Sequence, residues 1–139
     1  MKLKLQLVFQ GTCEAAFNLY KDAFNGEIVF LFRKAEDKSI QVNEQEGKQI
    51  SHIVLKTKYF EIGGQDADNG QAVNGGNNAK QVLVFTDLKE LHRTFDLLSQ
   101  GGEVITPLEK TFFSEAIGEV VDKFGIRWLI MMTDDDYSA

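Results

Sequence analysis

Cysteine, proline and tryptophan each occur only once in this sequence, and histidine occurs twice. With Cys13 alone, no internal disulfide can form, which is typical of proteins from a reducing compartment. Cys13 has no adjacent histidine or second cysteine, so we expect a buried structural thiol rather than a reactive one. No apolar run approaches the roughly 20 residues of a membrane span, and the N-terminus has no signal-peptide core. These absences predict a cytoplasmic protein with no membrane partner.

Basic residues are also few. There are 15 Lys and Arg against 21 Asp and Glu, for a net charge of −6, and the basic residues form no cluster. Lys2, Lys4 and Lys34 are scattered, as expected for a solvated surface. An acidic chain without a basic patch is not expected to bind nucleic acid. Gly-rich phosphate loops, nucleophile elbows and Cys-x-x-Cys pairs are absent as well.

The most informative feature that is present is a repeat. Leu-Val-Phe at residues 7–9 recurs at 83–85, and Gly-Glu-Ile-Val at 26–29 recurs as Gly-Glu-Val-Ile at 102–105. Both pairs are separated by the same offset of 76 residues. An amphipathic helical pattern lies between the two anchors in each copy. Two copies of one unit predict a domain built from paired modules that share a pocket.

In the first copy, residues 2–9 alternate between apolar and polar, which is the period of a half-buried strand. A helix is expected near 12–24, with Thr12 as its N-cap. Further strands are expected at 27–33, 49–56 and 59–63. Residues 35–48 are charged and weakly patterned, which favours a long hairpin or mobile loop. Residues 66–80 hold four Asn and three Gly and are interpreted as the connection between the copies.

In the second copy, strands are expected at 81–85, 103–106, 117–121 and 126–132. Asp87 and Glu90 stand at capping-box spacing before a helix near 87–100. Pro107 is expected to end the strand that precedes it. Residues 133–139 form an acidic tail that we expect to be frayed.

The predicted fold class is therefore α+β. We expect two βαβββ modules whose eight strands form a curved, cleft-shaped mixed sheet, with the helices outside. The whole chain, 1–139, is expected to be a single domain. Module one covers about 1–66, the linker about 67–80 and module two about 81–132.

Four stretches carry a resemblance to a known family: residues 9–20, the segment from His52 to Asp66, residues 110–113 and residues 118–128. Together they span almost the whole chain. The sequence resembles the vicinal oxygen chelate superfamily, also called the glyoxalase/bleomycin-resistance fold, and within it the PhnB-like (demethylubiquinone methyltransferase-like) branch. The superfamily includes isomerases, dioxygenases, thiol transferases and simple binders, so the resemblance implies a fold more than an activity.

The resemblance also implies four positions for the ligands of a divalent metal ion. Allowing one residue of register error, they fall on Leu5, Ile62, Gln81 and Leu129, of which only Gln81 has a donor atom. A one-residue shift would recruit Gln6 and Glu61 but would turn those side chains to the other face of the sheet. Recruitment of His52 is a further alternative. We therefore predict no metal site and no cofactor.

His52 and Glu119 are the candidate catalytic residues. His52 lies in a predicted strand, where PhnB-like sequences often carry histidine, and an imidazole can donate or accept a proton near neutral pH. The alternative is a core histidine bonded to the backbone or to Glu119. The candidate ligand-binding residues are Trp128, Gln81 and Phe113, because aromatic and amide groups suit a pocket for a planar or hydrophobic ligand. Core filling is the alternative for Trp128.

Three functions remain open at this point. The first is a metal-independent small-molecule binding protein of the resistance or sequestration type, and the poor ligand set favours it. The second is a metal-dependent lyase, isomerase or dioxygenase of the glyoxalase type, so whether the protein is an enzyme stays open. The third is a purely structural or regulatory module. Independently of these functions we expect a homodimer, because a half-open sheet exposes edges and apolar surface that a second copy can cover.

Overall fold

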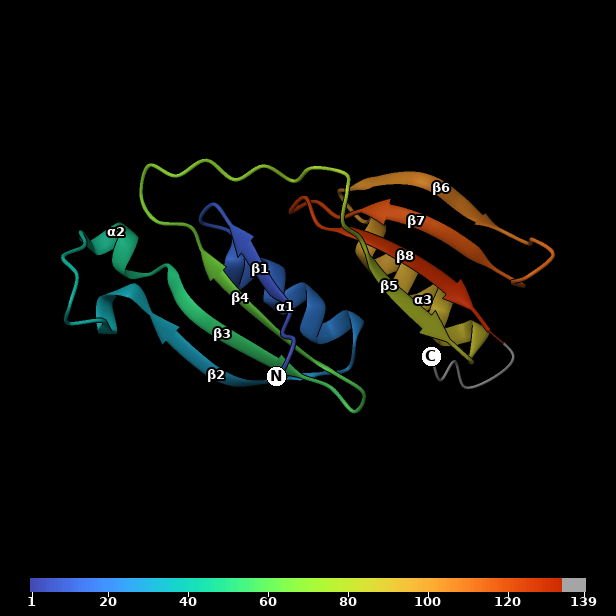
Figure 1. The fold of residues 1–139 in the computed structure, drawn as a ribbon, viewed down its shortest axis with the longest axis horizontal. Coiled ribbons are helices and arrows are strands. Elements are labelled where there is room, and N and C mark those ends of the chain that lie inside the picture. Colours follow the sequence, from blue (N-terminus) through green and yellow to red (C-terminus); the bar gives the residue numbers. More distant parts are fainter. Residues whose placement is uncertain (134–139) are drawn as a thin grey trace. The chain divides into compact units, whose positions relative to one another are not determined.

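The computed structural model describes residues 1–133 (Figure 1). The acidic tail expected at 133–139 thus lies outside the described residues, except for Thr133. The chain divides into two compact units, residues Met1–Asn74 and the residues from Gly75 onward. Each unit contains one βαβββ module, which confirms the α+β class and the repeat. The eight strands are distributed over two four-stranded mixed sheets, one in each unit.

Unit one contains sheet one, in the strand order β1-β4-β3-β2. β1 pairs in parallel with β4, and the other two pairings are antiparallel. The elements that build the module are β1 (Gln6–Phe9), α1 (Cys13–Ala23), β2 (Glu27–Arg33), β3 (Ile50–Lys56) and β4 (Glu61–Asp66). The fourth strand therefore begins two residues later and ends three residues later than the sequence pattern predicts.

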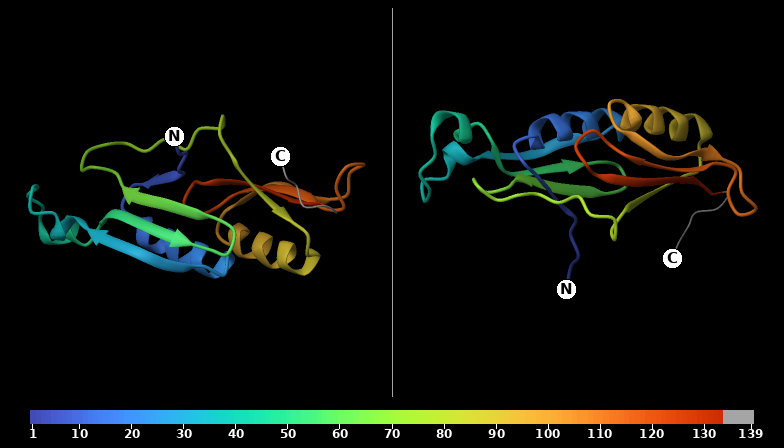
Figure 2. Two further views of the ribbon diagram at one scale, coloured as in Figure 1. Left: turned by 60° about the horizontal axis from the view of Figure 1, so that its bottom comes forward. Right: turned by 90° about the horizontal axis from the view of Figure 1, so that it is seen from above.

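Helix α1 covers one face of sheet one (Figures 1 and 2). Its buried positions include Ala16, Phe17 and Tyr20, one stripe of an amphipathic helix. They pack on the strand residues that alternate inward, such as Phe9 and Leu55, which are almost fully buried. Phe9, Phe17 and Tyr20 form a cluster of rings with centroids 5.6–6.5 Å apart. None of the helices described in unit one packs on the opposite face of sheet one.

The segment between β2 and β3 is more ordered than its weak pattern indicates. It holds a 3-10 helix, η1 (Lys34–Glu36), and a one-turn helix, α2 (Glu44–Gly47), whose N-cap Asn43 accepts a hydrogen bond from the Glu46 amide. The sequence predicts that Lys34 lies on the solvated surface, but Lys34 is buried. It is only 6% exposed, and its Nζ donates to Ala67 O at 2.7 Å and to Gln49 Oε1 at 3.0 Å. These two acceptors allow the ammonium group to be buried.

Asp66 belongs to β4, not to the connection between the copies. Its carboxylate is buried and accepts hydrogen bonds from the backbone amides of Cys13, at 3.0 Å, and Ile50, at 2.8 Å. Thr12 occupies the N-cap position of α1, but its side chain makes no capping hydrogen bond. The first turn of α1 is thus capped by a carboxylate from strand β4. A local sequence pattern cannot show such a cap, because the two residues are distant in sequence.

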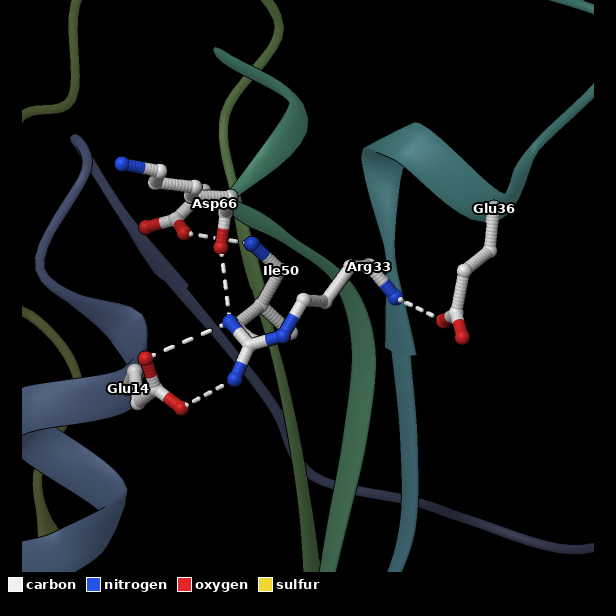
Figure 3. Close-up of polar contacts among 6 residues, drawn as sticks. Glu14, Arg33, Glu36, Ile50 and Asp66 are labelled. Atoms are coloured by element: carbon white, nitrogen blue, oxygen red, sulfur yellow. Dashed lines mark hydrogen bonds and ion pairs between the residues drawn. The ribbon is translucent and has the colours of Figure 1, made fainter. Parts of the chain in front are cut away.

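A second polar contact fixes the end of β2 against α1 (Figure 3). The Arg33 guanidinium forms a two-point ion pair with Glu14 of the first turn of α1 and also donates to Lys48 O at 2.7 Å. The Arg33 amide donates to Glu36 at 2.7 Å. The hydrogen bond from Arg33 lowers the pKa of Glu14 below its ordinary value. These contacts join helix, strand and connecting segment at one corner of unit one.

Unit two repeats the arrangement in sheet two, with the strand order β5-β8-β7-β6. Its elements are β5 (Gln81–Phe85), α3 (Leu88–Ser99), β6 (Glu103–Glu109), β7 (Ile117–Val121) and β8 (Arg127–Met132). Asp87 caps α3, as predicted, through hydrogen bonds from the amides of Lys89 and Glu90. None of the described helices has the length and hydropathy required to cross a membrane.

Pro107 does not end its strand, contrary to the sequence expectation. β6 continues through it to Glu109, although the pairing with β7 is irregular between Thr106 and Glu109. β6 lies at an edge of sheet two, so a residue without an N–H group needs no partner on the outer side.

Helix α3 packs on one face of sheet two (Figure 2). Gly118 of β7 marks that face, since a side chain there would meet the ring of Phe95 from α3. Val120 and Trp128, which are paired across β7 and β8, lie on the same face and are almost fully buried. The residues that alternate with them, Glu119 among them, lie on the face without a helix.

Candidate functional site

The candidate site residues occur mainly on the sheet faces that α1 and α3 do not cover. We call the uncovered side of sheet one helix-free face 1. The strand register places on it Gln6 and Val8 of β1, Phe30 and Phe32 of β2, His52, Val54 and Lys56 of β3, and Glu61, Gly63 and Gln65 of β4. Phe30 is 49% exposed, so this face presents apolar surface to the solvent.

A polar cluster lies in the middle of helix-free face 1. The Gln6 amide Nε2 donates to His52 Nδ1 and to Gln65 Oε1, both at 3.2 Å. With Nδ1 accepting, the proton of neutral His52 is on Nε2. The His52 ring lies 5.7 Å from the Phe30 ring, centroid to centroid. His52 is therefore half-buried and oriented by side chains of three strands, and its partner is Gln6 rather than Glu119.

Gly63 makes room for this cluster. A Cβ atom at this position would collide with Gln6 Oε1 and lie 3.3 Å from His52 Cε1. Any side chain at residue 63 would therefore displace the Gln6 amide from His52. The pairing of Gln6 with Gly63 across β1 and β4 is what brings the two amides and the imidazole together.

We call the uncovered side of sheet two helix-free face 2. The register places there Val82 and Val84 of β5, Ile117, Glu119 and Val121 of β7, Arg127, Leu129 and Met131 of β8, and Glu103, Thr106 and Glu109 of β6. Lys80, just before β5, reaches Glu119 on the same face. Six of these residues are apolar, and Val82 is 50% exposed. Lys80, Glu119 and Arg127 gather near one end of β8.

Glu119 forms ion pairs with two basic side chains, those of Lys80 and Arg127. Its Oε1 accepts from Lys80 Nζ at 2.6 Å and its Oε2 from Arg127 Nη1 at 2.7 Å, while the Glu119 side chain itself is only 10% exposed. The hydrogen bond from Lys80 has the largest effect and lowers the pKa of Glu119; burial opposes it, and Arg127 adds to the lowering. Glu119 is thus held as a carboxylate at neutral pH. In this state it is better suited to hold Lys80 and Arg127 in place than to donate a proton.

The structure places Trp128 and Gln81 away from this cluster. Trp128 is 1% exposed, faces the α3 side, and its indole Nε1 donates to Asp122 Oδ2 at 2.9 Å. Gln81 is paired with Trp128 across β5 and β8 and so lies on the same face. Side chains alternate along a strand, so Trp128 and Gln81 point away from helix-free face 2. We therefore do not expect either side chain to contact a ligand on that face. The position of Trp128 agrees with the alternative that it fills the core.

Phe113 lies in a different part of unit two. It is 56% exposed, its ring is 5.0 Å from that of Phe112, and both line a depression of about 270 Å³ between the β6–β7 loop and the end of β8. Met132 and Thr133 line the same depression, whereas Arg127 stands at the start of β8. Glu119 is paired with Leu129, three residues before Met132, so at about 3.3 Å per residue the two positions on β8 lie roughly 10 Å apart. Glu119 does not line the depression in which Phe113 lies.

The residues at the implied metal positions do not fit a metal ion. Ile62 is buried on the α1 side, Gln81 faces α3, and Leu129 has no donor atom. The donors that do come together, Gln6, His52 and Gln65, are two neutral amides and one imidazole. Glu61 lies on the same face of β4, two residues before Gly63, but makes no hydrogen bond with them among the described residues. Such a set is weak for a divalent cation. Among residues 1–133 no group of three or more His, Cys, Asp or Glu side chains is placed to hold one.

Cys13 is fully buried in the first turn of α1. Burial raises the pKa of its thiol far above the ordinary range, and the nearby carboxylates of Asp66 and Glu14 act in the same direction. A thiol that is neither ionised nor accessible is unreactive, as its isolated position in the sequence indicates.

Comparison with known proteins extends these observations. No family model matches the chain. A relative, the protein YjdN of Escherichia coli (strain K12), is 28% identical over 138 residues, which cover 94% of each chain. The solved structure of protein PA1353 from Pseudomonas aeruginosa is similar with a TM-score of 0.86 and 24% identity, covering 97% of this chain and 99% of that one.

Two further solved structures define the class. The PhnB protein from Bacillus cereus matches with a TM-score of 0.79 and 23% identity, over 96% of this chain and all of the other. A glyoxylase/bleomycin resistance protein/dioxygenase domain from Frankia sp. EAN1pec matches with a TM-score of 0.67 and 13% identity, over 96% and 97% of the two chains. The chain therefore has the fold of the vicinal oxygen chelate superfamily. The similar structures include a PhnB protein, in agreement with the branch that the four sequence stretches predict.

Sequence reasoning missed Gln65, Lys80 and Arg127 as site residues. The signal that was available is strand alternation: in the strand that contains Trp128, Arg127 and Leu129 must face away from the indole. Alternation with the buried Asp66 would likewise have placed Gln65 on helix-free face 1. That argument requires β4 to extend to Asp66, whereas the sequence pattern ends the strand at residue 63. Lys80 precedes its strand, and its contact with Glu119 spans 39 residues of sequence.

Proposed function

We propose that the protein binds a small apolar or planar molecule and that this binding needs no metal ion. The observation that carries the proposal is the composition of the two helix-free faces. Each combines exposed apolar side chains, such as Phe30 and Val82, with one compact polar cluster. Small-molecule sites are typically apolar surfaces with a few precisely placed polar groups. The weak donor set at the implied metal positions supports the metal-independent form.

In this proposal His52 orients the ligand on helix-free face 1. Gln6 fixes the imidazole through Nδ1, which leaves Nε2 as a hydrogen-bond donor for a ligand oxygen. Glu119 acts on helix-free face 2 by positioning Lys80 and Arg127. Trp128 and Gln81 support sheet two from the α3 side, and Phe113 is assigned to the separate depression beside Met132.

An acid–base reaction centred on His52 is the second candidate. A half-buried imidazole with one nitrogen fixed and the other available is the arrangement that general acid–base catalysis requires. A glyoxalase-type reaction that depends on a metal ion has less support, because it would need donors that the implied positions lack.

Binding can be tested with Nile red, a neutral planar dye that becomes fluorescent on apolar surfaces. We expect saturable fluorescence that is unchanged by EDTA, because no metal ion takes part. Val84→Glu, which places a charge on helix-free face 2, and Phe30→Glu, which does so on helix-free face 1, should each weaken binding severalfold. Tyr59→Glu is the matched control, since Tyr59 is 83% exposed in the β3–β4 turn.

Two results would contradict the proposal. If EDTA abolishes dye binding and a divalent ion restores it, the metal-independent form fails. If Tyr59→Glu weakens binding as much as Val84→Glu and Phe30→Glu do, the helix-free faces are not the binding surface.

We also propose that the protein forms a homodimer. β2 and β6 each lie at one edge of their sheet, and both expose apolar side chains: Val29 and Leu31 on β2, Val104 and Ile105 on β6. Exposed apolar edges favour pairing with another chain, and twofold symmetry is the commonest arrangement of soluble oligomers.

A further inference from the structure

Arg127 on helix-free face 2 has hydrogen-bonding capacity that the described residues do not use. Its Nη1 donates to Glu119, but its Nε is buried and has no hydrogen-bond partner within residues 1–133. A buried N–H group without an acceptor costs about 1–3 kcal/mol. The Nε–Nη2 edge of a guanidinium is one of the edges that bind a carboxylate through two parallel hydrogen bonds.

The charges within the cluster itself do not balance. Lys80 and Arg127 share one carboxylate, that of Glu119, so these three side chains carry one net positive charge. Glu103 of β6 is paired with Val121, the partner of Arg127, but forms no ion pair with either basic side chain among the described residues. The Lys80 side chain is 44% exposed, which leaves its ammonium group accessible to a second acceptor. A cluster with one surplus positive charge and an unused donor edge is complementary to a single anionic group.

The surface next to the cluster is apolar. Leu129 and Met131 follow Arg127 on the same face of β8, and Val82 and Val84 are paired beside them on β5. Val82 and Val84 are both more than 40% exposed. The cationic cluster therefore lies at the start of an apolar strip along β5 and β8.

We infer that the molecule bound on helix-free face 2 is an amphipathic carboxylate, with its headgroup at Lys80 and Arg127 and its apolar body along the Val82–Leu129–Met131 strip. This inference rests on the proposed function and specifies the class of its ligand. The carboxylate accepts from the Nε–Nη2 edge of Arg127 and from Lys80, while Glu119 keeps both cations in place. Because Nε is buried, binding requires a small movement of the Arg127 side chain.

The test compares two ligands of nearly the same shape, 1-naphthylacetate and its neutral amide, 1-naphthylacetamide, which lacks the negative charge and the second acceptor oxygen. Isothermal titration calorimetry measures their affinities, and amide resonances of Val82, Leu129 and Met131 in two-dimensional NMR locate binding. We expect the carboxylate to bind about tenfold more tightly than the amide, with a preference that shrinks as salt is raised.

Lys80→Gln should reduce the affinity for the carboxylate about threefold to tenfold and leave that for the amide unchanged. Lys89→Gln is the matched control: it removes the same charge from α3, on the other side of sheet two. Arg127→Lys keeps the charge but loses the two-point edge, and it should also weaken binding of the carboxylate only. Circular dichroism verifies that each variant is folded.

The outcomes separate the inference from the proposed function. Equal affinities for acid and amide, with resonances of the strip shifted by both, would overturn the anionic ligand and leave the binding face intact. A loss of carboxylate affinity in Lys89→Gln as large as that in Lys80→Gln would also overturn it, because the effect would then be one of net charge. If neither ligand shifts the resonances of the strip, both the inference and binding on helix-free face 2 fail.

Discussion

Trp128 and Asp122 are joined by a buried hydrogen bond, from the indole Nε1 to the carboxylate Oδ2, at 2.9 Å. The other oxygen of Asp122 accepts from the backbone amides of Phe124, at 2.9 Å, and Ile126, at 3.1 Å. One carboxylate thus closes the turn between β7 and β8 and also fixes the largest side chain of unit two. This arrangement makes Trp128 a core residue, with consequences that experiments can separate from ligand binding.

Trp128→Phe is expected to lower the free energy of unfolding by about 1–3 kcal/mol, because Asp122 loses a buried donor while most of the apolar volume is kept. The affinity for 1-naphthylacetate should not change, since the indole lies on the α3 side of the sheet. Urea unfolding followed by circular dichroism gives the first quantity, and calorimetry gives the second. A large loss of affinity in a fully folded variant would place Trp128 in the ligand site after all.

Asp66→Asn is expected to destabilise unit one by about 2–4 kcal/mol. An amide side chain has only one oxygen, so it cannot accept from the amides of both Cys13 and Ile50, and one buried N–H group is left without a partner. Asp68→Asn, two residues further on and exposed, is the matched control and should be near neutral. Equal unfolding midpoints for the two variants would show that Asp66 does not hold α1 and β3 together.

The stability of the protein is expected to fall as the pH drops below about 4.5. The pKa of Glu119 is lowered from its ordinary value of 4.5 by Lys80 and Arg127, so this carboxylate stabilises the folded state above that pH. The contribution is lost as the pH falls from 4.5 through the lowered folded-state pKa. Urea midpoints between pH 7 and pH 3 should fall less steeply in Glu119→Gln. An exposed glutamate of the same unit provides the control, Glu115→Gln, which should keep the wild-type slope.

Light scattering at micromolar concentration should give about twice the 15.7 kDa chain mass, because a second copy covers the exposed edges. Leu31→Lys and Ile105→Lys add charge to the edge strands β2 and β6 and should shift the protein towards the monomer. Ile40→Lys, a change to an exposed residue outside the sheets, should not. A wild-type mass of one chain would refute the homodimer.

Elemental analysis of protein purified without added metal should find well below one equivalent of Ni, Zn, Mn or Fe. The expected reason is the ligand set, since Ile62 and Leu129 have no donor atom and Gln81 faces α3. A melting curve recorded with each metal should show no specific stabilisation. Stoichiometric metal would favour the glyoxalase-type enzyme instead.

Much of the fold could be predicted from local sequence because its signals are local. The 76-residue repeat identified the paired modules, and helical periodicity located α1 and α3 within one or two residues. Asp87 acts on amides two and three residues away, so its capping role is visible in sequence. The strands predicted at 27–33, 81–85 and 117–121 have the observed bounds of β2, β5 and β7.

The polar contacts that build the candidate site were decided only by the tertiary structure. Asp66 caps a helix that begins 53 residues earlier, Gln6 meets His52 across 46 residues, and Lys80 reaches Glu119 across 39. Each of these distances in sequence is closed by strand pairing, and a one-residue change of register would turn every side chain involved to the opposite face.

The sequence by itself therefore determined the module, its duplication and the residue types available for chemistry, because hydrophobic periodicity and turn residues act over a few positions. It could not determine which face Trp128 and Gln81 occupy, or that Lys34 is buried. Those outcomes depend on the pairing of β5 with β8 and on the contact of η1 with the end of β4. Pairing between distant strands depends on how the whole sheet packs against its helix, so a local sequence pattern cannot predict which strands pair.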